Sequence, residues 1–175
     1  MSEKINHIKW LLVDQIYDLT TPIVQMRKNL ADPDFDIESK EALGQFRLCN
    51  HAIIISLFKL HEILKVYGKE INEFPTHVKV PLQKLRAEIE KREICIFRNK
   101  YAAHIIDDNT GKPVSLKKGG ELLEKIAGKN IAEMLNFYEW VYPKNGCTTN
   151  NCIIPAVQST LEHCKNILGS GWERP

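Results

Sequence analysis

The run Ala52-Ile53-Ile54-Ile55 (residues 52–55) decides the fold of this sequence. It is apolar on more than one helical face, which predicts a helix enclosed by other helices. The buried stripe of that helix recurs at steps of three, four and seven residues: Leu43, Phe46, Ile53, Leu57, Leu60 and Leu64. We expect the helix to begin near residues 37–39 and to stop at Gly68. A length of about 30 residues suits a helical bundle.

Apolar residues recur on one helical face before this run as well: Ile5, Ile8, Leu12, Ile16, Leu19 and Ile23. Pro22 interrupts that pattern, so it either kinks one helix or begins a second helix capped by Thr21. A third helix is predicted to open at Pro81, a residue that fits the first helical position. Its buried stripe holds Leu82, Leu85, Ile89 and Ile96, and Phe97 and Tyr101 extend the apolar surface.

Two further helical segments complete the pattern. One follows Gly119-Gly120 and ends at Pro143, with Gly128 as a candidate bend. The last is a short helix from Pro155 to Gly169. No useful strand alternation or internal repeat is present. The sequence therefore predicts a single all-α domain over residues 1–175, an antiparallel bundle of four long helical segments plus a short C-terminal helix.

The composition is that of a soluble globular protein, with 43% hydrophobic and 26% charged residues and a net charge of +2. No apolar run approaches the roughly 20 residues that span a bilayer, and the N-terminus does not resemble a signal peptide. We therefore expect a cytoplasmic protein. Residues 79–100 hold seven basic and three acidic residues, an excess that could attract phosphates or form a solvated helix face.

The five cysteines do not form a clear metal motif. Cys49 and Cys95 fall in helical patterns and are expected to be buried thiols. Cys147 and Cys152 lie close enough to chelate zinc, but the paired short spacings of a zinc site are missing. A disulfide is disfavoured in the cytosol. We expect neither a metal nor a cofactor.

The stretch Arg98-Asn99-Lys100-Tyr101-Ala102-Ala103-His104 ends the third helical pattern and precedes a run of helix breakers at residues 107–113. In a straight helix Arg98 and His104 lie roughly 120° apart and about 9 Å along the axis, so they would not converge. Convergence requires the helix to end or bend between them, or a second copy of the chain to complete the site.

These residue types suffice for RNA cleavage without a metal. A histidine can transfer the proton of the 2′-hydroxyl or of the leaving oxygen near neutral pH. An arginine can stabilise the charge on the phosphate with paired hydrogen bonds, and an asparagine can position it.

Arg98-Asn99, followed by four residues and His104, resembles the motif of the HEPN superfamily of small helical bundles, and its setting is similar to the abortive-infection branch. The resemblance implies a metal-independent RNA endonuclease that acts as a homodimer, as a toxin or antiphage effector with an antitoxin partner. Arg98 would neutralise the scissile phosphate, Asn99 would orient it and His104 would be the general acid or base. Lys91, Arg92 and Lys100 would contact RNA, and a residue of the long second helix would join the site, with Asn50, His51 and Ser56 as candidates.

Two alternatives stay open. The protein could be a catalytically inactive HEPN-like dimer that binds RNA, a nucleotide or a partner protein. The polar cluster could also be structural, with His104 capping helix carbonyls and Arg98 pairing with Glu93 or Asp107.

Overall fold

A computed structural model describes residues 2–102, 106–107, 111–113, 115–146, 151–169 and 174, with only the backbone described at 106, 107, 113 and 116. Within these residues the chain is an all-α bundle, which confirms the predicted fold class. Two strands of two residues each, β1 (Ile106–Asp107) and β2 (Lys112–Pro113), pair antiparallel. None of the described helices is long and apolar enough to cross a membrane.

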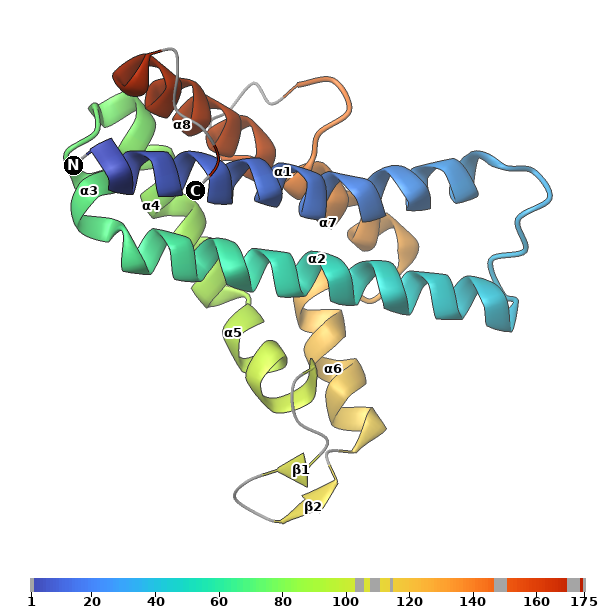
Figure 1. Cartoon of the computed structure of the whole chain (residues 1–175). Coiled ribbons are helices and arrows are strands. Elements are labelled where there is room, and N and C mark those ends of the chain that lie inside the picture. The colour runs from blue at the N-terminus through green and yellow to red at the C-terminus, as the bar shows by residue number, and fades with distance from the viewer. Residues whose placement is uncertain are drawn as a thin grey trace.

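Helices α1 (Ser2–Ala31) and α2 (Lys40–Val66) lie side by side and antiparallel, and they form the long axis of the molecule (Figure 1). Pro22 is inside α1, so the helix continues through it. Ser39 caps α2, because its side chain accepts a hydrogen bond from the backbone of Ala42 at 3.0 Å. Within the predicted stripe of α2, Ile53, Leu57 and Leu60 are fully buried, whereas Leu43 is 60% exposed.

Helices α3 (Gly68–Asn72) and α4 (Thr76–Lys91) follow α2. The predicted stop of the second helix at Gly68 is confirmed, because α2 ends at Val66 with Tyr67 as its C-cap, and Gly68 then begins the short helix α3. The predicted start of the next helix at Pro81 is wrong, because α4 starts at Thr76. Pro75 stands in the extended conformation directly before α4, and its carbonyl accepts the first hydrogen bonds of that helix.

The third predicted helix is not continuous. Helix α4 ends at Lys91, and Glu93 adopts a left-handed conformation with φ of 59°. The chain then forms α5 (Ile94–Phe97) and the π-helix η1 (Arg98–Ala102). The change of direction buries Phe97 completely and leaves Ile96 41% exposed, so the prediction that Ile96 is buried is wrong.

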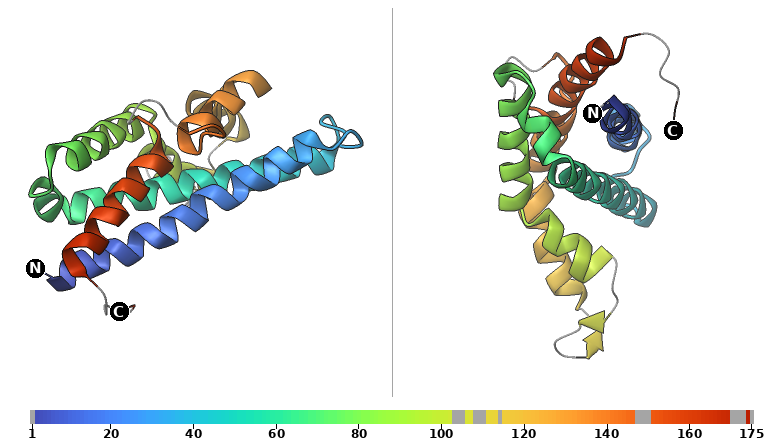
Figure 2. Two further views of the ribbon diagram at one scale, coloured as in Figure 1. Left: turned by 90° about the horizontal axis from the view of Figure 1, so that it is seen from above. Right: turned by 60° about the vertical axis from the view of Figure 1, so that its left-hand side comes forward.

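The fourth predicted segment consists of α6 (Leu116–Ala127) and α7 (Ile131–Val141), separated at Gly128, whose φ is 105°. Gly119 and Gly120 lie inside α6 and do not precede it. Helix α8 (Ile153–Leu168) begins before Pro155 and packs against α1 and α4. Figures 1 and 2 show α5, α6 and the two short strands projecting from one side of the bundle.

The cysteines depart in part from expectation. Cys49 is buried and Cys95 is partly buried, and both are free thiols. Cys152 is disulfide-bonded, contrary to the expectation of reduced cysteines, and Cys147 lies outside the described residues. Among the residues that the structure describes, no group of three or more histidine, cysteine or acidic side chains could hold a metal ion.

Candidate functional site

The segment carrying Arg98 is attached to α2 by three aromatic rings. The imidazole of His51 meets the ring of Phe97 at 5.3 Å and that of Tyr101 at 6.0 Å, both edge-on. The rings of Phe97 and Tyr101 are themselves 5.1 Å apart. These contacts hold α5 and η1 against one face of α2, with His51 between the two elements.

Arg98 points along the same face. Its guanidinium lies 4.7 Å from the ring centroid of Phe58 on α2, and its Nη1 donates a hydrogen bond to Oδ1 of Asn99 at 3.0 Å. Asn99 and Lys100 are exposed. Arg98 is therefore oriented by a cation–π contact and by its neighbour in a partly buried position.

Three residues of α2 share this face. Arg47, His51 and Phe58 are spaced by four and seven residues, which places them within about 20–40° of one another around the helix. We call the group formed by these three residues with Arg98, Asn99 and Lys100 the Arg98 surface. Neither Arg47 nor Phe58 was predicted from the sequence, although their helical spacing from His51 is the signal that could have identified them.

The spacing along α2 limits what one chain can do. Phe58 follows His51 by about 10.5 Å along the helix axis. The Arg98 guanidinium and the His51 imidazole therefore lie beside different turns of α2.

The His51 imidazole is kept neutral. Burial lowers its pKa below the ordinary value, and the positive charge of Arg47 lowers it further. A neutral imidazole can accept a proton at pH 7, so this histidine has the protonation state that a general base needs.

The helix changes form within the stretch that carries Arg98. The α-helical segment stops at Phe97, the π-helix covers Arg98 to Ala102, and the chain is extended at Ile106. A π-helix is wider than an α-helix, so the straight-helix estimate of the angle between Arg98 and His104 does not apply. His104 lies outside the described residues.

Gly119 fixes the position of η1 against α6. A Cβ atom at Gly119 would collide with the Tyr101 ring, so only glycine permits this approach. The ring is thereby clamped between α6 and His51, and Arg98 is held three residues before it on the same short helix.

The other predicted second-helix residues point elsewhere. Asn50 is 5% exposed, and its Oδ1 accepts a hydrogen bond from the Tyr138 hydroxyl of α7 at 3.0 Å. Ser56 is 4% exposed, on the core side of α2. Of the three candidates, His51 is the one in contact with the segment that carries Arg98.

The predicted RNA-binding cations fall into two groups. Arg92 donates to the carboxylate of Glu88 at 2.9 Å and to the carbonyl of Ile126 at 2.8 Å, and it lies 4.5 Å from the Trp140 ring. It therefore holds α4 against α6 and α7. Lys91 has an 80% exposed side chain, which lies 3.8 Å from Glu88.

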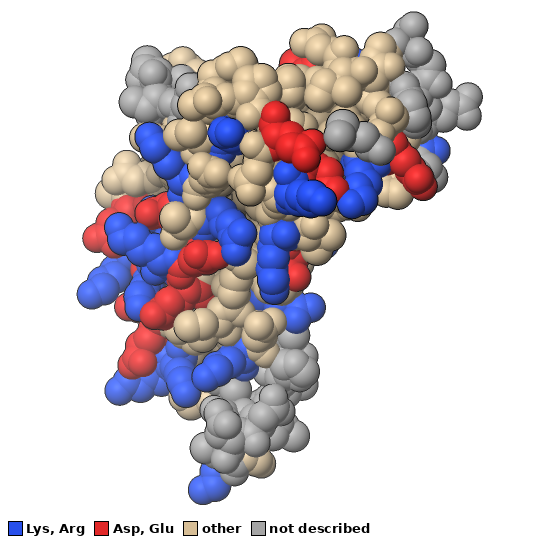
Figure 3. Space-filling view, turned by 90° about the vertical axis from the view of Figure 1, so that its left-hand side faces the viewer, with Lys and Arg blue, Asp and Glu red and all other residues tan. Residues whose placement is uncertain are grey.

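The acidic residues of 79–100 form ion pairs with neighbouring basic residues. Arg86 pairs with Glu90 at 3.1 Å, and Glu93 pairs with Lys125 at 2.6 Å. Figure 3 shows the result, a face on which basic and acidic side chains are interleaved. Such mixed surfaces attract polyanions weakly. Arg47, Arg98 and Lys100 are the cations of the Arg98 surface.

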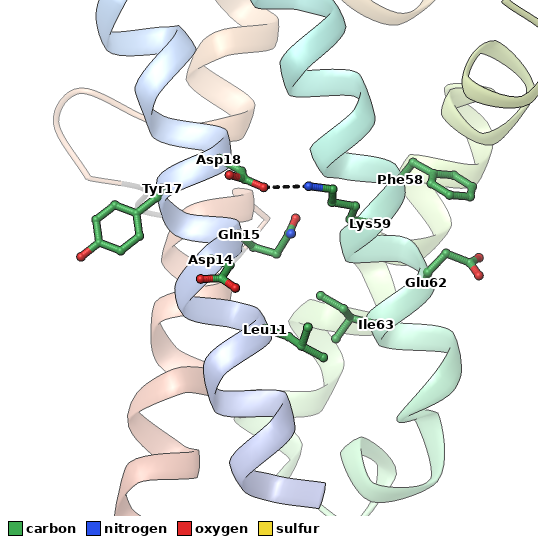
Figure 4. A pocket seen from close by; sticks show the side chains of 9 residues that line it. All are labelled: Leu11, Asp14, Gln15, Tyr17, Asp18, Phe58, Lys59, Glu62 and Ile63. Carbon is green, nitrogen blue, oxygen red and sulfur yellow. Dashed lines mark hydrogen bonds and ion pairs between the residues drawn. The ribbon is translucent and has the colours of Figure 1, made fainter. Parts of the chain in front are cut away.

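A groove of about 510 Å³ lies between α1 and α2 beside the Arg98 surface, and Phe58 belongs to both (Figure 4). Lys59 of α2 pairs with Asp18 of α1 across it at 3.0 Å. Asp14 and Glu62 add further carboxylates to its lining. These carboxylates make the lining of the groove more acidic than the Arg98 surface beside it.

No protein-family model and no curated protein matches the chain. The chain is similar to a solved structure, the integron cassette protein Vpc_cass2 from the mobile metagenome of V. paracholerae, with a TM-score of 0.72 and 24% sequence identity. The similarity covers 94% of this chain and 98% of that protein. The two proteins therefore share the whole fold, and at this identity the likeness shows the fold alone.

Proposed function

We propose that the protein is a metal-independent RNA endonuclease of the HEPN type that acts as a homodimer. The observation that carries the proposal is the Arg98 surface, where a permanently charged guanidinium and a neutral imidazole lie along one face of α2. The first can bind phosphate and the second can move a proton at neutral pH.

Each residue has a role that follows from its position. Arg98, stacked on Phe58, presents its remaining N–H groups to the scissile phosphate and stabilises the charge that develops there. Asn99 orients the guanidinium through its carboxamide oxygen. His104 takes the proton of the 2′-hydroxyl or returns one to the leaving 5′-oxygen.

The homodimer answers a geometric need. The guanidinium of Arg98 stacks on Phe58, which follows His51 by about 10.5 Å along the axis of α2, so the two groups lie beside different turns of that helix. A second copy related by a two-fold axis brings a second Arg98-to-His104 segment to the same RNA strand.

The test is cleavage of a fluorescent single-stranded RNA in the presence of EDTA. The wild type should leave a cyclic phosphate, and His104→Ala should abolish cleavage, because loss of a proton-transfer group costs about 10² to 10⁴ in rate. His77→Ala, which changes an exposed histidine of α4, is the matched control and should cleave as the wild type does. Full activity in His104→Ala would remove the proposal.

The dimer has its own test. Arg98→Ala and His104→Ala proteins, each inactive alone, should regain part of the activity when mixed if one dimer combines residues from two chains. Sedimentation should show a dimer at the concentrations of the assay. An active monomer would contradict the shared site and leave the cleavage proposal intact.

A second candidate is a dimeric module that binds RNA, a nucleotide or a partner protein without cleavage. The separation of His51 from Arg98 favours it, because binding needs no convergence on one atom. RNA binding that Arg98→Ala weakens, with no cleavage product, would support this candidate.

An RNA endonuclease of this kind would arrest growth from within the cytoplasm, as a toxin or antiphage effector restrained by an antitoxin protein. Expression of the wild type should slow a bacterial culture, and His104→Ala should not. Equal growth of the two cultures would exclude the effector role.

A further inference from the structure

A second pocket, of about 470 Å³, lies between the beginning of α2 and the turn from α6 to α7. Its walls are mostly apolar, formed by Leu43, Phe46, Leu123, Ile131 and Met134. Leu43 is 60% and Ile131 43% exposed, so apolar surface is open to solvent at the mouth. The size and lining are typical of pockets that bind small molecules.

One polar side chain reaches this pocket from the core. Asn50 lines it and is only 5% exposed. Its Oδ1 accepts a hydrogen bond from the hydroxyl of Tyr138 at 3.0 Å, and its Nδ2 lies 3.8 Å from the sulfur of Met134. Burial raises the pKa of Tyr138, so the phenol keeps its proton and acts as the donor. The amide is thus oriented with its oxygen toward α7 and its nitrogen toward Met134.

That orientation leaves donor capacity in an apolar setting. A carboxamide nitrogen carries two N–H groups, and a thioether is a weak acceptor. Buried N–H groups in proteins nearly always donate to a stronger acceptor than a thioether. An oxygen acceptor on a ligand would supply the bond that Met134 supplies poorly.

The charges at the rim exclude some ligands. The lining of the pocket includes two carboxylates, those of Glu38 and Glu124, and one ammonium group, that of Lys129. The balance is negative, which disfavours a carboxylate or phosphate. Among the described residues that line the pocket, the buried polar side chain is that of Asn50, which is uncharged. No buried carboxylate among them could therefore pair with the ammonium group of an amine ligand.

We propose that this pocket binds an uncharged, largely apolar compound through a carbonyl oxygen that accepts from Nδ2 of Asn50, such as an N-alkyl amide, an ester or a lactone. The apolar part lies between Leu43 and Ile131, where it covers surface now open to water. This site is separate from the Arg98 surface and does not depend on RNA cleavage.

The first experiment uses N-hexylacetamide as the probe, with binding followed by heteronuclear NMR. Saturable shifts are expected for residues of α2, α6 and α7 around the pocket. Leu43→Trp fills the mouth from an exposed position and should weaken binding at least tenfold. Leu48→Trp is the matched control, because Leu48 is 71% exposed on the same helix and does not line the pocket. Unchanged affinity in Leu43→Trp, or equal weakening in Leu48→Trp, would overturn the proposal.

The second experiment tests the carbonyl contact. Ethyl hexyl ether has a similar apolar body and a poorer acceptor, so it should bind at least fivefold more weakly than the amide. The double variant Asn50→Leu/Tyr138→Phe removes both partners of the buried hydrogen bond and avoids leaving one unpaired. In it the amide should bind no better than the ether. An amide that keeps its advantage there would show that Asn50 is not the donor, and saturable binding of hexanoate as tight as that of the amide would exclude a neutral-ligand site.

Discussion

Arg92 and Arg98 are six residues apart in one basic segment, and the structure uses them in opposite ways. The guanidinium of Arg92 is bound to the carboxylate of Glu88 on α4, the helix that Arg92 caps, and it also contacts a main-chain carbonyl of α6 and an indole ring of α7. The guanidinium of Arg98 contacts one aromatic ring and the side chain next to it in sequence. Arg92 stabilises the fold, whereas under the proposed function Arg98 offers its remaining donors to a phosphate.

The difference teaches that a charge count along the sequence does not locate a polyanion site. Each acidic residue of the segment is paired with a basic one, partly from within α4 and partly from α6. The break at residues 92–93 turns Arg98 toward α2. This change of direction decides which basic side chains of the segment would remain available to a ligand. Substitutions at the two arginines should therefore separate activity from stability.

The largest effect is expected for Arg98→Ala. RNA cleavage should fall by about 10²–10³, because the positive charge at the phosphate is lost. The free energy of unfolding should fall by no more than about 1 kcal/mol, the value of a partly exposed cation–π contact. Cleavage rates and urea denaturation measure the two quantities. A variant that cleaves normally but unfolds easily would give Arg98 the structural role of Arg92.

Arg92→Ala should show the opposite pattern, with a larger effect on the free energy of unfolding than on RNA cleavage. Its loss leaves the Ile126 carbonyl without its charged donor and removes the contact with Trp140, so the free energy of unfolding should fall by about 2 kcal/mol. Lys91→Ala, at the exposed neighbour, should change stability by less than about 0.5 kcal/mol. Equal effects of the two substitutions in urea denaturation would contradict the comparison.

The support of the Arg98 segment can be tested at two adjacent glycines. A methyl group at Gly119 collides with Tyr101, so Gly119→Ala should destabilise the protein by about 1–2 kcal/mol, at the low end for overpacking because the ring is partly exposed. A methyl group at Gly120 would meet nothing within 4 Å, so Gly120→Ala should stabilise α6 by up to about 1 kcal/mol. Thermal unfolding of both variants measures the difference, and a shift of the same sign in both would show that Tyr101 does not depend on Gly119.

The sequence predicted the bundle because apolar periodicity reports burial directly. The stripes around Leu12 in α1 and Leu57 in α2 repeat over many turns, so local exceptions do not hide them. The break at Glu93 escaped prediction since it depends on the distant partners Lys125 and Ile126. Gly119 gave a helix-breaking signal, yet it is inside α6 because the Tyr101 ring needs the space.

The candidate site was predictable only in part, for the same reason. Arg98 and Asn99 were proposed from a local motif, and the structure places both in the π-helix η1, where Arg98 is partly buried and Asn99 is exposed. The choice of His51 over Asn50 required knowledge of which face of α2 meets α5. That face depends on tertiary packing, since both residues are adjacent and polar.

The smallest effect concerns the charge beside His51. Folding lowers the pKa of His51 below 6.5. As the pH falls, the His51 imidazole of the unfolded chain is therefore protonated at a higher pH than that of the folded protein. The stability contributed by the neutral imidazole is therefore complete above the unfolded pKa and is lost as the pH drops toward the folded value. Arg47→Gln removes the repulsion and should move the His51 pKa upward in an NMR titration, although burial still holds it below the ordinary value. Arg86→Gln, on α4, should leave the His51 titration unchanged. If Arg47→Gln also leaves it unchanged, burial alone lowers the pKa of this imidazole, and the charge of Arg47 has no part in it.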